Sequence, residues 1–422
     1  MNETTVTNEI KKSQCPKCGA TIPVYKEYVS WCECGWGLEP QKPDHPLNLF
    51  ESLYVQAGRR LSKNLFDKLI AAPTLKPTWN VAKVIATALA TLVHATTLIF
   101  VLIGIVLIAR GLPNLCIAFW GVVILFLAWV LRPQRAKLKE EIASREKHRA
   151  LYQVADRISS KLDASPVDGI VFGNYYNAGF SEIGWRRKKI LFLGLPFFSV
   201  LDAQERIYLI AHEIAHSVNG DSIRSFFVGS AIDSLLTWYS MLRPEVILDL
   251  SINSLVGLVM VPLRLTLLGI AQIPRWTAFS LINLLWRDSQ RAEYLADLLA
   301  TQVSGKAAAL TAMEKGAMEE KFVVIAQRMT ADRNDDRDFF KVLQDAIDTM
   351  PERERERIRR VSLLEDSRLD VTHPPMSNRV ALIKARGSQQ AEVMMSNQQF
   401  DQIQNELAPA RTKIQKDLLQ RY

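Results

Sequence analysis

The longest apolar stretches of the chain lie in its first third. Residues 84–109 carry no formal charge apart from a possible proton on His94, and residues 111–131 repeat this composition after a short turn. As a helix the first stretch would be about 39 Å long, more than the roughly 30 Å of a bilayer core. A buried helix of a soluble domain rarely runs this far without a polar face. The pattern therefore predicts a transmembrane hairpin over 83–131, with His94 and Cys116 as packing residues inside it.

A further apolar region lies beyond the middle of the chain. Residues 251–273 are apolar apart from Arg264, and the composition continues after Pro274. This stretch suits one or two membrane segments. It equally suits a hydrophobic hairpin at the membrane interface, in which Arg264 snorkels or faces protein. We favour partial membrane insertion, within an insertion that covers 226–286.

Shorter patterns surround this region. Residues 169–194 break apolar β-branched and aromatic runs with Gly and Asn, which is typical of two or three strands joined by turns. Helical periodicity then resumes, with Asp202 as N-cap and Glu205 as its capping-box partner. The region 331–370 is dense in charged residues and is expected to form a solvated helix and loop. The chain from 389 onward is a Gln-rich amphipathic helix.

Charge decides between two kinds of partner. The 422-residue chain carries a formal net charge of +8, which fits nucleic acid or an anionic membrane surface. The basic residues flank the apolar hairpin, whereas the loop inside it has only Arg110. They are Arg59, Arg60, Lys63, Lys68, Lys76 and Lys83 before the hairpin, and Arg132, Arg135, Lys137, Lys139, Arg145, Lys147 and Arg149 after it. The positive-inside rule therefore predicts a multi-pass protein of the cell (inner) membrane, with the N-terminus and the domain after the hairpin in the cytoplasm. We expect no secretory signal peptide, because the first twenty residues are polar.

Four of the five cysteines lie in the first 34 residues, as the pairs Cys15–Cys18 and Cys32–Cys34. The CPKC pair, followed by glycine, is typical of a zinc knuckle, whereas the CEC pair has one intervening residue where the usual ribbon has two. Four thiolates would close a structural Zn²⁺ site and fold a module, 1–40, that is too small to hold itself together. Redox thiols or another metal remain as alternatives.

This module would recognise protein, either a substrate or a regulator. Its aromatic residues, Tyr25, Trp31 and Trp36, fit the core of a ribbon as well as a platform for stacking nucleic-acid bases.

The sequence IAHEIAH at 210–216 places His212 and His216 on one face of a helix, where both imidazoles can bind one ion. Glu213 lies about 100° round the helix, where a general base can take a proton from water. The competing interpretation is an amphipathic core helix that contains two histidines.

Catalytic zinc needs a third protein ligand. Glu293 offers one, with Asp297 one turn later on the same helix face. The alternative is an acidic pair on a solvated surface, flanked by Arg287 and Arg291. The apolar neighbours of Asp297 favour burial, which suits a carboxylate that fixes the tautomer of a ligand histidine.

Four motifs occur in a fixed order: NAGF at 177–180, HEIAHSVNGD, RAEYLAD, and THPPMSNRVALI at 372–383. In this order they resemble the gluzincin peptidases that include the HtpX-like heat-shock proteases and the CAAX prenyl endopeptidases. The resemblance covers roughly 130–390, with the two apolar spans upstream. It implies an α+β, mainly α fold: a gluzincin-type metallopeptidase domain with a small edge-strand sheet and a two-helix transmembrane hairpin.

The resemblance also implies a role for each matching residue. His212, His216 and Glu293 would bind Zn²⁺, Glu213 would be the general base, and Asp297 would support a ligand histidine. His373 and Arg379 would lie near the substrate and help to stabilise the oxyanion. The backbone of Asn177, Ala178, Gly179 and Phe180 would pair with an extended peptide by β-augmentation.

We therefore expect a membrane-anchored zinc endopeptidase with one catalytic and one structural Zn²⁺. Its substrates would be membrane or membrane-associated polypeptides, cleaved for quality control or regulated processing. The first rival is a non-catalytic membrane adaptor that uses the zinc ribbon for partner binding. A tethered nucleic-acid binder is less favoured, because it leaves residues 210–300 unexplained. We expect five parts along the chain. The first three are a zinc ribbon at 1–40, a basic amphipathic linker helix at 41–82 and the transmembrane hairpin at 83–131, with helices near 84–109 and 111–131. The peptidase domain at 132–390 and a helical tail at 391–422 follow.

Overall fold

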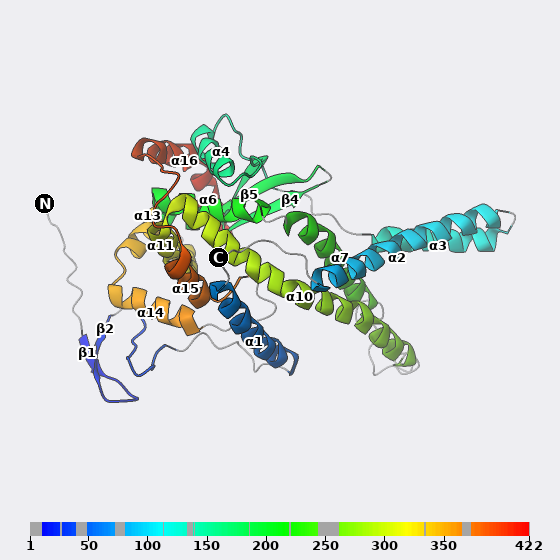
Figure 1. Cartoon of the computed structure of the whole chain (residues 1–422), viewed down its shortest axis with the longest axis horizontal. Coiled ribbons are helices and arrows are strands. Elements are labelled where there is room, and N and C mark those ends of the chain that lie inside the picture. The colour runs from blue at the N-terminus through cyan, green and yellow to red at the C-terminus, as the bar shows by residue number, and fades with distance from the viewer. Residues whose placement is uncertain are drawn as a thin grey trace.

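The computed structural model describes residues 11–25, 28–38, 49–71, 81–112, 114–132, 138, 140–184, 186–218, 221–243, 261–332, 335–364 and 373–421. Over these residues the chain is mainly helical with two small sheets, which confirms the predicted α+β class. Figure 1 shows a body of helices from which the pair α2 and α3 projects to one side. The helices and strands are β1 (Lys11–Gln14), β2 (Thr21–Val24), α1 (Leu49–Ala71), α2 (Val81–Gly111), α3 (Leu115–Leu131), α4 (Arg149–Lys161), β3 (Gly169–Gly173), β4 (Ala178–Ile183), β5 (Lys188–Gly194), α5 (Leu195–Val200), α6 (Ala203–Val218), α7 (Asp221–Leu242), α10 (Val261–Ser304), α11 (Lys306–Gly316), α12 (Glu319–Ala331), α13 (Phe339–Asp348), α14 (Glu352–Leu364), α15 (Met376–Arg386) and α16 (Asn397–Arg421).

The projecting pair is the hairpin that the apolar pattern predicts. Its two helices approach closely at Gly104 and Gly121, because a Cβ on Gly121 would lie 2.8 Å from the carbonyl oxygen of Gly104. His94 packs as expected, with its Nε2 atom 3.0 Å from the carbonyl oxygen of Phe227 on α7. The expectation for Cys116 was wrong: its side chain is exposed, because it lies on the outer face of the first turn of α3.

The second apolar region forms part of one helix of 44 residues, α10, which continues through Pro274 without a break. Residues 251–260, where this region was expected to begin, lie outside the described residues. Within the described chain, α2 and α10 are long and apolar enough to cross a membrane, by length and composition, and α3 is a shorter apolar helix. Large apolar side chains are exposed along the first part of α10, including Leu265, Ile273 and Trp276.

A buried ion pair joins the hairpin to α10. The Nζ atom of Lys83 lies 3.2 Å from Oδ1 of Asp288, and both side chains are largely shielded from solvent. Next to it, a small apolar cluster packs α2, α7 and α10 together; it includes Ala90, Ala231 and Leu281.

Of the two or three strands predicted within 169–194, the structure has three, which form a sheet of order β3-β5-β4. β3 is parallel and β4 antiparallel to the central strand, so that β4 is an edge strand over its described length. The chain continues through α5 into α6, where the predicted capping box is present. The backbone N–H groups of Gln204 and Glu205 donate to Asp202 Oδ1, and the Asp202 N–H donates to Glu205 Oε2 at 2.8 Å.

The C-terminal helix α16 belongs to the main core. Its apolar face, which includes Ile403 and Leu407, is buried against that core. Glu406 accepts hydrogen bonds from the N–H groups of Ala150 and Leu151, and thereby caps the first turn of α4. The segment expected as a tail therefore stabilises the body of the protein.

Candidate active site

Helices α6 and α10 bring the three predicted metal ligands together. The Nε2 atom of His212 lies 3.6 Å from Oε2 of Glu293, and the Nε2 atom of His216 lies 3.5 Å from Oε1 of the same carboxylate. The two imidazole rings are perpendicular, with centroids 5.0 Å apart. One ligand atom from each side chain lies within 4.8 Å of the other two.

These separations fit a metal ion. They are too long for hydrogen bonds. Two ligands that each lie about 2.0–2.2 Å from a tetrahedral Zn²⁺ are separated by roughly 3.3–3.6 Å. The donor set, two imidazoles and one carboxylate, is one that zinc accepts, with a fourth position left for water or substrate. The alternative of a solvated acidic pair was wrong, because Glu293 is 6% and Asp297 0% exposed.

Asp297 is the centre of a buried polar network behind the ligands. Its Oδ1 atom lies 3.0 Å from Nδ1 of His212 and accepts a hydrogen bond of 2.8 Å from the Tyr208 hydroxyl. Arg379 donates to both carboxylate oxygens, at 2.9 and 2.7 Å. Burial alone would raise the pKa of Asp297, but Arg379 and His212 hold it well below its usual value. Asp297 therefore stays ionised beside Nδ1 of His212.

The network gives Arg379 a partner that the sequence did not suggest. Its side chain is mostly buried and its guanidinium is engaged by Asp297. Helix α15 packs against α10 and α11 and turns Arg379 inward. Contact between Arg379 and a substrate stays a prediction.

His373 lies on the open side of the site. Its Nδ1 atom is 2.6 Å from Oε2 of Glu293, while 46% of its side chain is exposed. Glu213 is buried beside His212 on α6. The site thus combines three candidate ligands, one carboxylate next to them and one accessible imidazole.

The segment predicted to bind substrate lies at the edge of the three-stranded sheet. Ala178, Gly179 and Phe180 begin the edge strand β4, which packs against α6. Asn177 precedes it, and its carbonyl accepts a hydrogen bond of 2.9 Å from the N–H of Gly194.

Two residues near the site were missed by the sequence analysis. Tyr208 precedes His212 by four positions, so helical spacing was a sufficient clue to their shared face. The ring of Tyr175 packs flat on Gly173, where an added Cβ would meet the ring at 2.0 Å. Burial, and to a smaller extent the charges of Glu140 and Glu213, raise the pKa of Tyr175 to about 12.

The four N-terminal cysteines also converge. The Sγ atoms of Cys15 and Cys34 are 3.7 Å apart, and those of Cys18 and Cys32 are 3.5 Å apart. Four thiolates at about 2.3 Å from a tetrahedral Zn²⁺ would be roughly 3.8 Å from each other, so this set fits a closed structural site.

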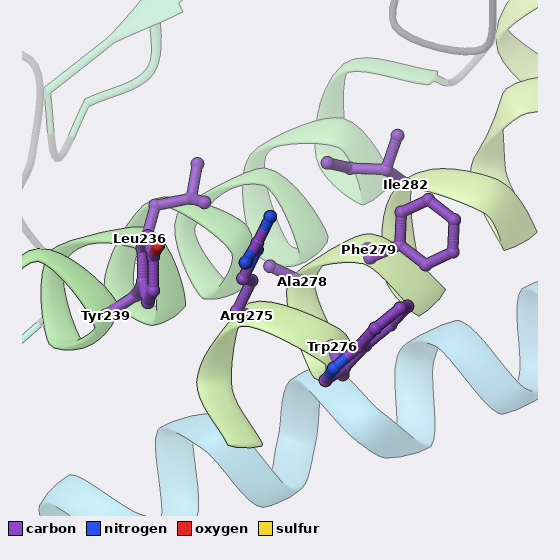
Figure 2. Close-up of a pocket in the computed structure, with 7 residues that line it drawn as sticks. All are labelled: Leu236, Tyr239, Arg275, Trp276, Ala278, Phe279 and Ile282. Atoms are coloured by element: carbon purple, nitrogen blue, oxygen red, sulfur yellow. The ribbon is translucent and has the colours of Figure 1, made fainter. Parts of the chain in front are cut away.

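A pocket lies between α7 and α10, away from both sets of candidate ligands (Figure 2). Leu236 and Tyr239 come from α7, while Arg275, Trp276, Ala278, Phe279 and Ile282 come from α10. Arg275 stacks over the ring of Tyr239, 5.6 Å from its centroid. The pocket is apolar and aromatic, with one cation, in the part of α10 that precedes the active site.

The fold and the ligand geometry define a metal-dependent hydrolase built on an HExxH helix. The sequence pattern of Peptidase family M48 matches residues 142–387, more than half of the chain, and the protein belongs to this family. Neither a curated protein nor a solved structure matched the chain. The protein is therefore a metallopeptidase, and its substrates are polypeptides. Its apolar helices, together with family membership, suggest a membrane protein.

Proposed function

We propose that this protein is a membrane-anchored, zinc-dependent endopeptidase that cleaves membrane or membrane-associated proteins. The observation that carries the proposal is the convergence of His212, His216 and Glu293, with Glu213 beside them on α6. We assign the catalytic metal as Zn²⁺ and the Cys15–Cys34 cluster as a second, structural Zn²⁺ site.

The chain's own groups supply most of the chemistry. A bound Zn²⁺ would act as a Lewis acid on the scissile carbonyl and make a nucleophilic water accessible near neutral pH. Glu213 takes a proton from the attacking water and then delivers it to the leaving amine. Asp297 holds the His212 imidazole in one tautomer, and Arg379 and Tyr208 keep Asp297 in place.

His373 is the best-placed group for the developing oxyanion. It is accessible and lies next to Glu293, at the side of the site that is open to solvent. An imidazole N–H there would donate a hydrogen bond to the oxygen that gains charge in the transition state.

The substrate would bind as an additional strand. The edge of β4 offers backbone groups, and pairing through these tolerates many sequences. Residues 177–180 would align the peptide alongside α6, with Tyr175 as a wall near Glu213.

The apolar surface supports membrane anchoring and membrane-derived substrates. The exposed apolar side chains of α2, α3 and α10 have the composition that a bilayer solvates. With basic residues on both flanks of the hairpin, the active site would face the cytoplasm of a cell (inner) membrane protein.

The substitution Glu213→Gln tests the proposal. Loss of the general base should lower kcat for a detergent-solubilised model membrane substrate by about 10²–10⁴-fold. Metal content should not change, because Glu213 is not a ligand. The matched control is Glu146→Gln, on an exposed carboxylate, which should cleave like the wild type. Cleavage is followed by mass spectrometry of the products, and metal by elemental analysis.

The same variant distinguishes the peptidase proposal from the interpretation of the protein as a non-catalytic adaptor. An adaptor would keep its cellular phenotype with Glu213→Gln and lose it with Cys15→Ser. Undiminished cleavage by purified Glu213→Gln protein would rule out the proposed mechanism. A salt-sensitive gel shift is the outcome that would favour nucleic-acid binding.

A further inference from the structure

Residues 31–34 of the ribbon alternate between contacts with α14 and membership of the four-cysteine cluster. Cys32 and Cys34 belong to the four-thiol cluster, while Trp31 and Glu33 contact α14. The CEC spacing, one residue shorter than in an ordinary ribbon, therefore places a docking residue directly before and directly after Cys32.

The contact between Trp31 and α14 is extensive. Trp31 is 2% exposed, and Arg353 and Arg360 lie over its ring at 4.3 and 4.7 Å from the centroid. Its Nε1 atom donates to the carbonyl of Arg353 at 3.2 Å, and its own carbonyl accepts from the Arg353 guanidinium at 2.6 Å. Glu33 forms an ion pair with Arg360. Trp31 and Glu33 of the ribbon together contact Arg353 and Arg360 of α14.

Helix α14 has little apolar surface of its own to bury. Its sequence begins ERERERIRR, and its buried residues are Glu354 and Ser362. On its other side, polar contacts hold it: Arg359 pairs with Glu314 of α11 at 3.1 Å, and Arg355 donates to the Ile347 carbonyl at 2.6 Å. Ile358 packs against the main core but is only partly buried. A helix with so little buried apolar surface depends on its neighbours for stability. The clasp on Trp31 is therefore a substantial part of what holds α14.

The ribbon in turn depends on its thiols. Its buried cluster consists of Cys15, Ile22 and Cys32, with Trp36 partly buried against them. A core this small does not hold a fold, whereas a metal bound by four thiolates does. Trp31 and Glu33 flank a ligand directly, so their positions follow from metal binding.

Helix α14 is close to the active site along the chain and in space. It packs against α15, which carries Arg379, and His373 follows Leu364 by nine positions in the sequence. We propose that the four-cysteine ribbon is a metal-dependent clasp on α14, and that loading its metal stabilises the packing of α14 against α15, which carries Arg379. Its link to catalysis rests on the proposed peptidase function; the clasp itself does not.

The clasp is tested in the full chain by hydrogen exchange. The double variant Cys18→Ser, Cys34→Ser removes the two exposed thiols of the ribbon and should lower metal content from two ions per chain to one. Amides of α14 should then exchange about tenfold faster or more, because local unfolding becomes easier. Trp31→Ala should speed the same exchange while both metals are kept. The control Cys116→Ser removes a thiol on α3 and should change neither quantity. Unchanged protection of α14 in both ribbon variants would overturn the clasp.

The link to catalysis is tested by steady-state kinetics on the same proteins. In Trp31→Ala we expect kcat to fall several-fold with KM nearly unchanged, because the substrate strand β4 lies elsewhere. A wild-type kcat in a variant whose α14 exchanges rapidly would overturn the link between the clasp and catalysis. If wild-type protein shows no Glu213-dependent cleavage, the peptidase proposal fails, and the exchange measurement still decides the clasp.

Discussion

At the residue scale, the most informative side chain is Asp297. It is fully buried and yet charged, with contacts to Arg379, Tyr208 and His212. A buried charge of this kind is tolerable only while its partners remain. The network therefore links the stability of the fold to the geometry of the candidate metal ligands.

Asp297→Asn should be costly on both counts. It leaves the buried guanidinium of Arg379 without a counter-charge, so we expect a loss of about 3–5 kcal/mol in the free energy of unfolding. Metal affinity should fall by about 10–100-fold, because the His212 tautomer is no longer fixed. Denaturant titration and competitive metal titration measure the two effects.

The comparison is Asp156→Asn, at an exposed pair with Arg145. Exposed ion pairs contribute about 0–1 kcal/mol, so this change should be nearly silent. Equal losses in the two variants would contradict the role assigned to the buried network.

Spacing along one helix is readable from sequence, and contacts between distant helices are not. The shared face of His212 and His216 follows from helical geometry, and a carboxylate ligand was foreseeable on a second helix. The partner of Arg379 depends on how α15 packs against α10. The partner of Trp31, Arg353, lies on a helix that is 322 residues away in the sequence. Both are long-range packing outcomes that no local pattern carries.

At the scale of elements, local sequence signals could be read, whereas contacts between distant helices could not. The capping box of α6 and the strands within 169–194 could be predicted, although not their exact number, because turn and cap residues act on their neighbours. The charged region 331–370 was expected to be solvated, yet part of it forms α14, which Trp31 covers. Arginine side chains can present apolar stems and flat faces to aromatic rings, so a charged helix can still be a docking surface.

Helix α2 packs against α3 through Gly104 and Gly121, so a larger side chain at either position should not fit between the helices. Gly121→Val places atoms against Ile108 and the Gly104 carbonyl, where a Cβ already comes within 2.7–2.8 Å. Overpacking of this kind should destabilise the hairpin by about 1–3 kcal/mol. Gly269→Val on α10 is the control, because its Cβ would meet nothing within 4 Å. Thermal unfolding in detergent should separate the two variants, and equal melting temperatures would argue against close helix packing.

At the scale of the whole molecule, the proposed topology assigns each part of the chain to one side of the membrane. Asn114 accepts a hydrogen bond from the N–H of Cys116 and begins α3, so the connection is tight. Leu112 is among the most exposed apolar residues at this end. In the proposed topology this tip lies on the side of the membrane opposite the ribbon and the active site.

Labelling of intact cells tests this orientation. With Leu112→Cys in a Cys116→Ser background, an impermeant maleimide should label the tip from outside. The ribbon thiols should react only after the membrane is permeabilised and metal removed. Mass spectrometry locates the label, and labelled Cys18 in intact cells would reverse the proposed topology.

The length of α10 has a mechanical meaning. A straight helix of 44 residues extends about 66 Å, and this one carries exposed apolar residues at its start and Glu293 some 30 residues later. The Lys83–Asp288 ion pair joins α10 to α2 five residues before Glu293, and Figure 1 shows α10 running from the body of helices to α2 and α7. A thinner or thicker bilayer would tilt the apolar first part of α10. This tilt would move the Glu293 carboxylate relative to the imidazoles of His212 and His216, or strain the Lys83–Asp288 ion pair. Lipid composition would then tune how fast this enzyme works.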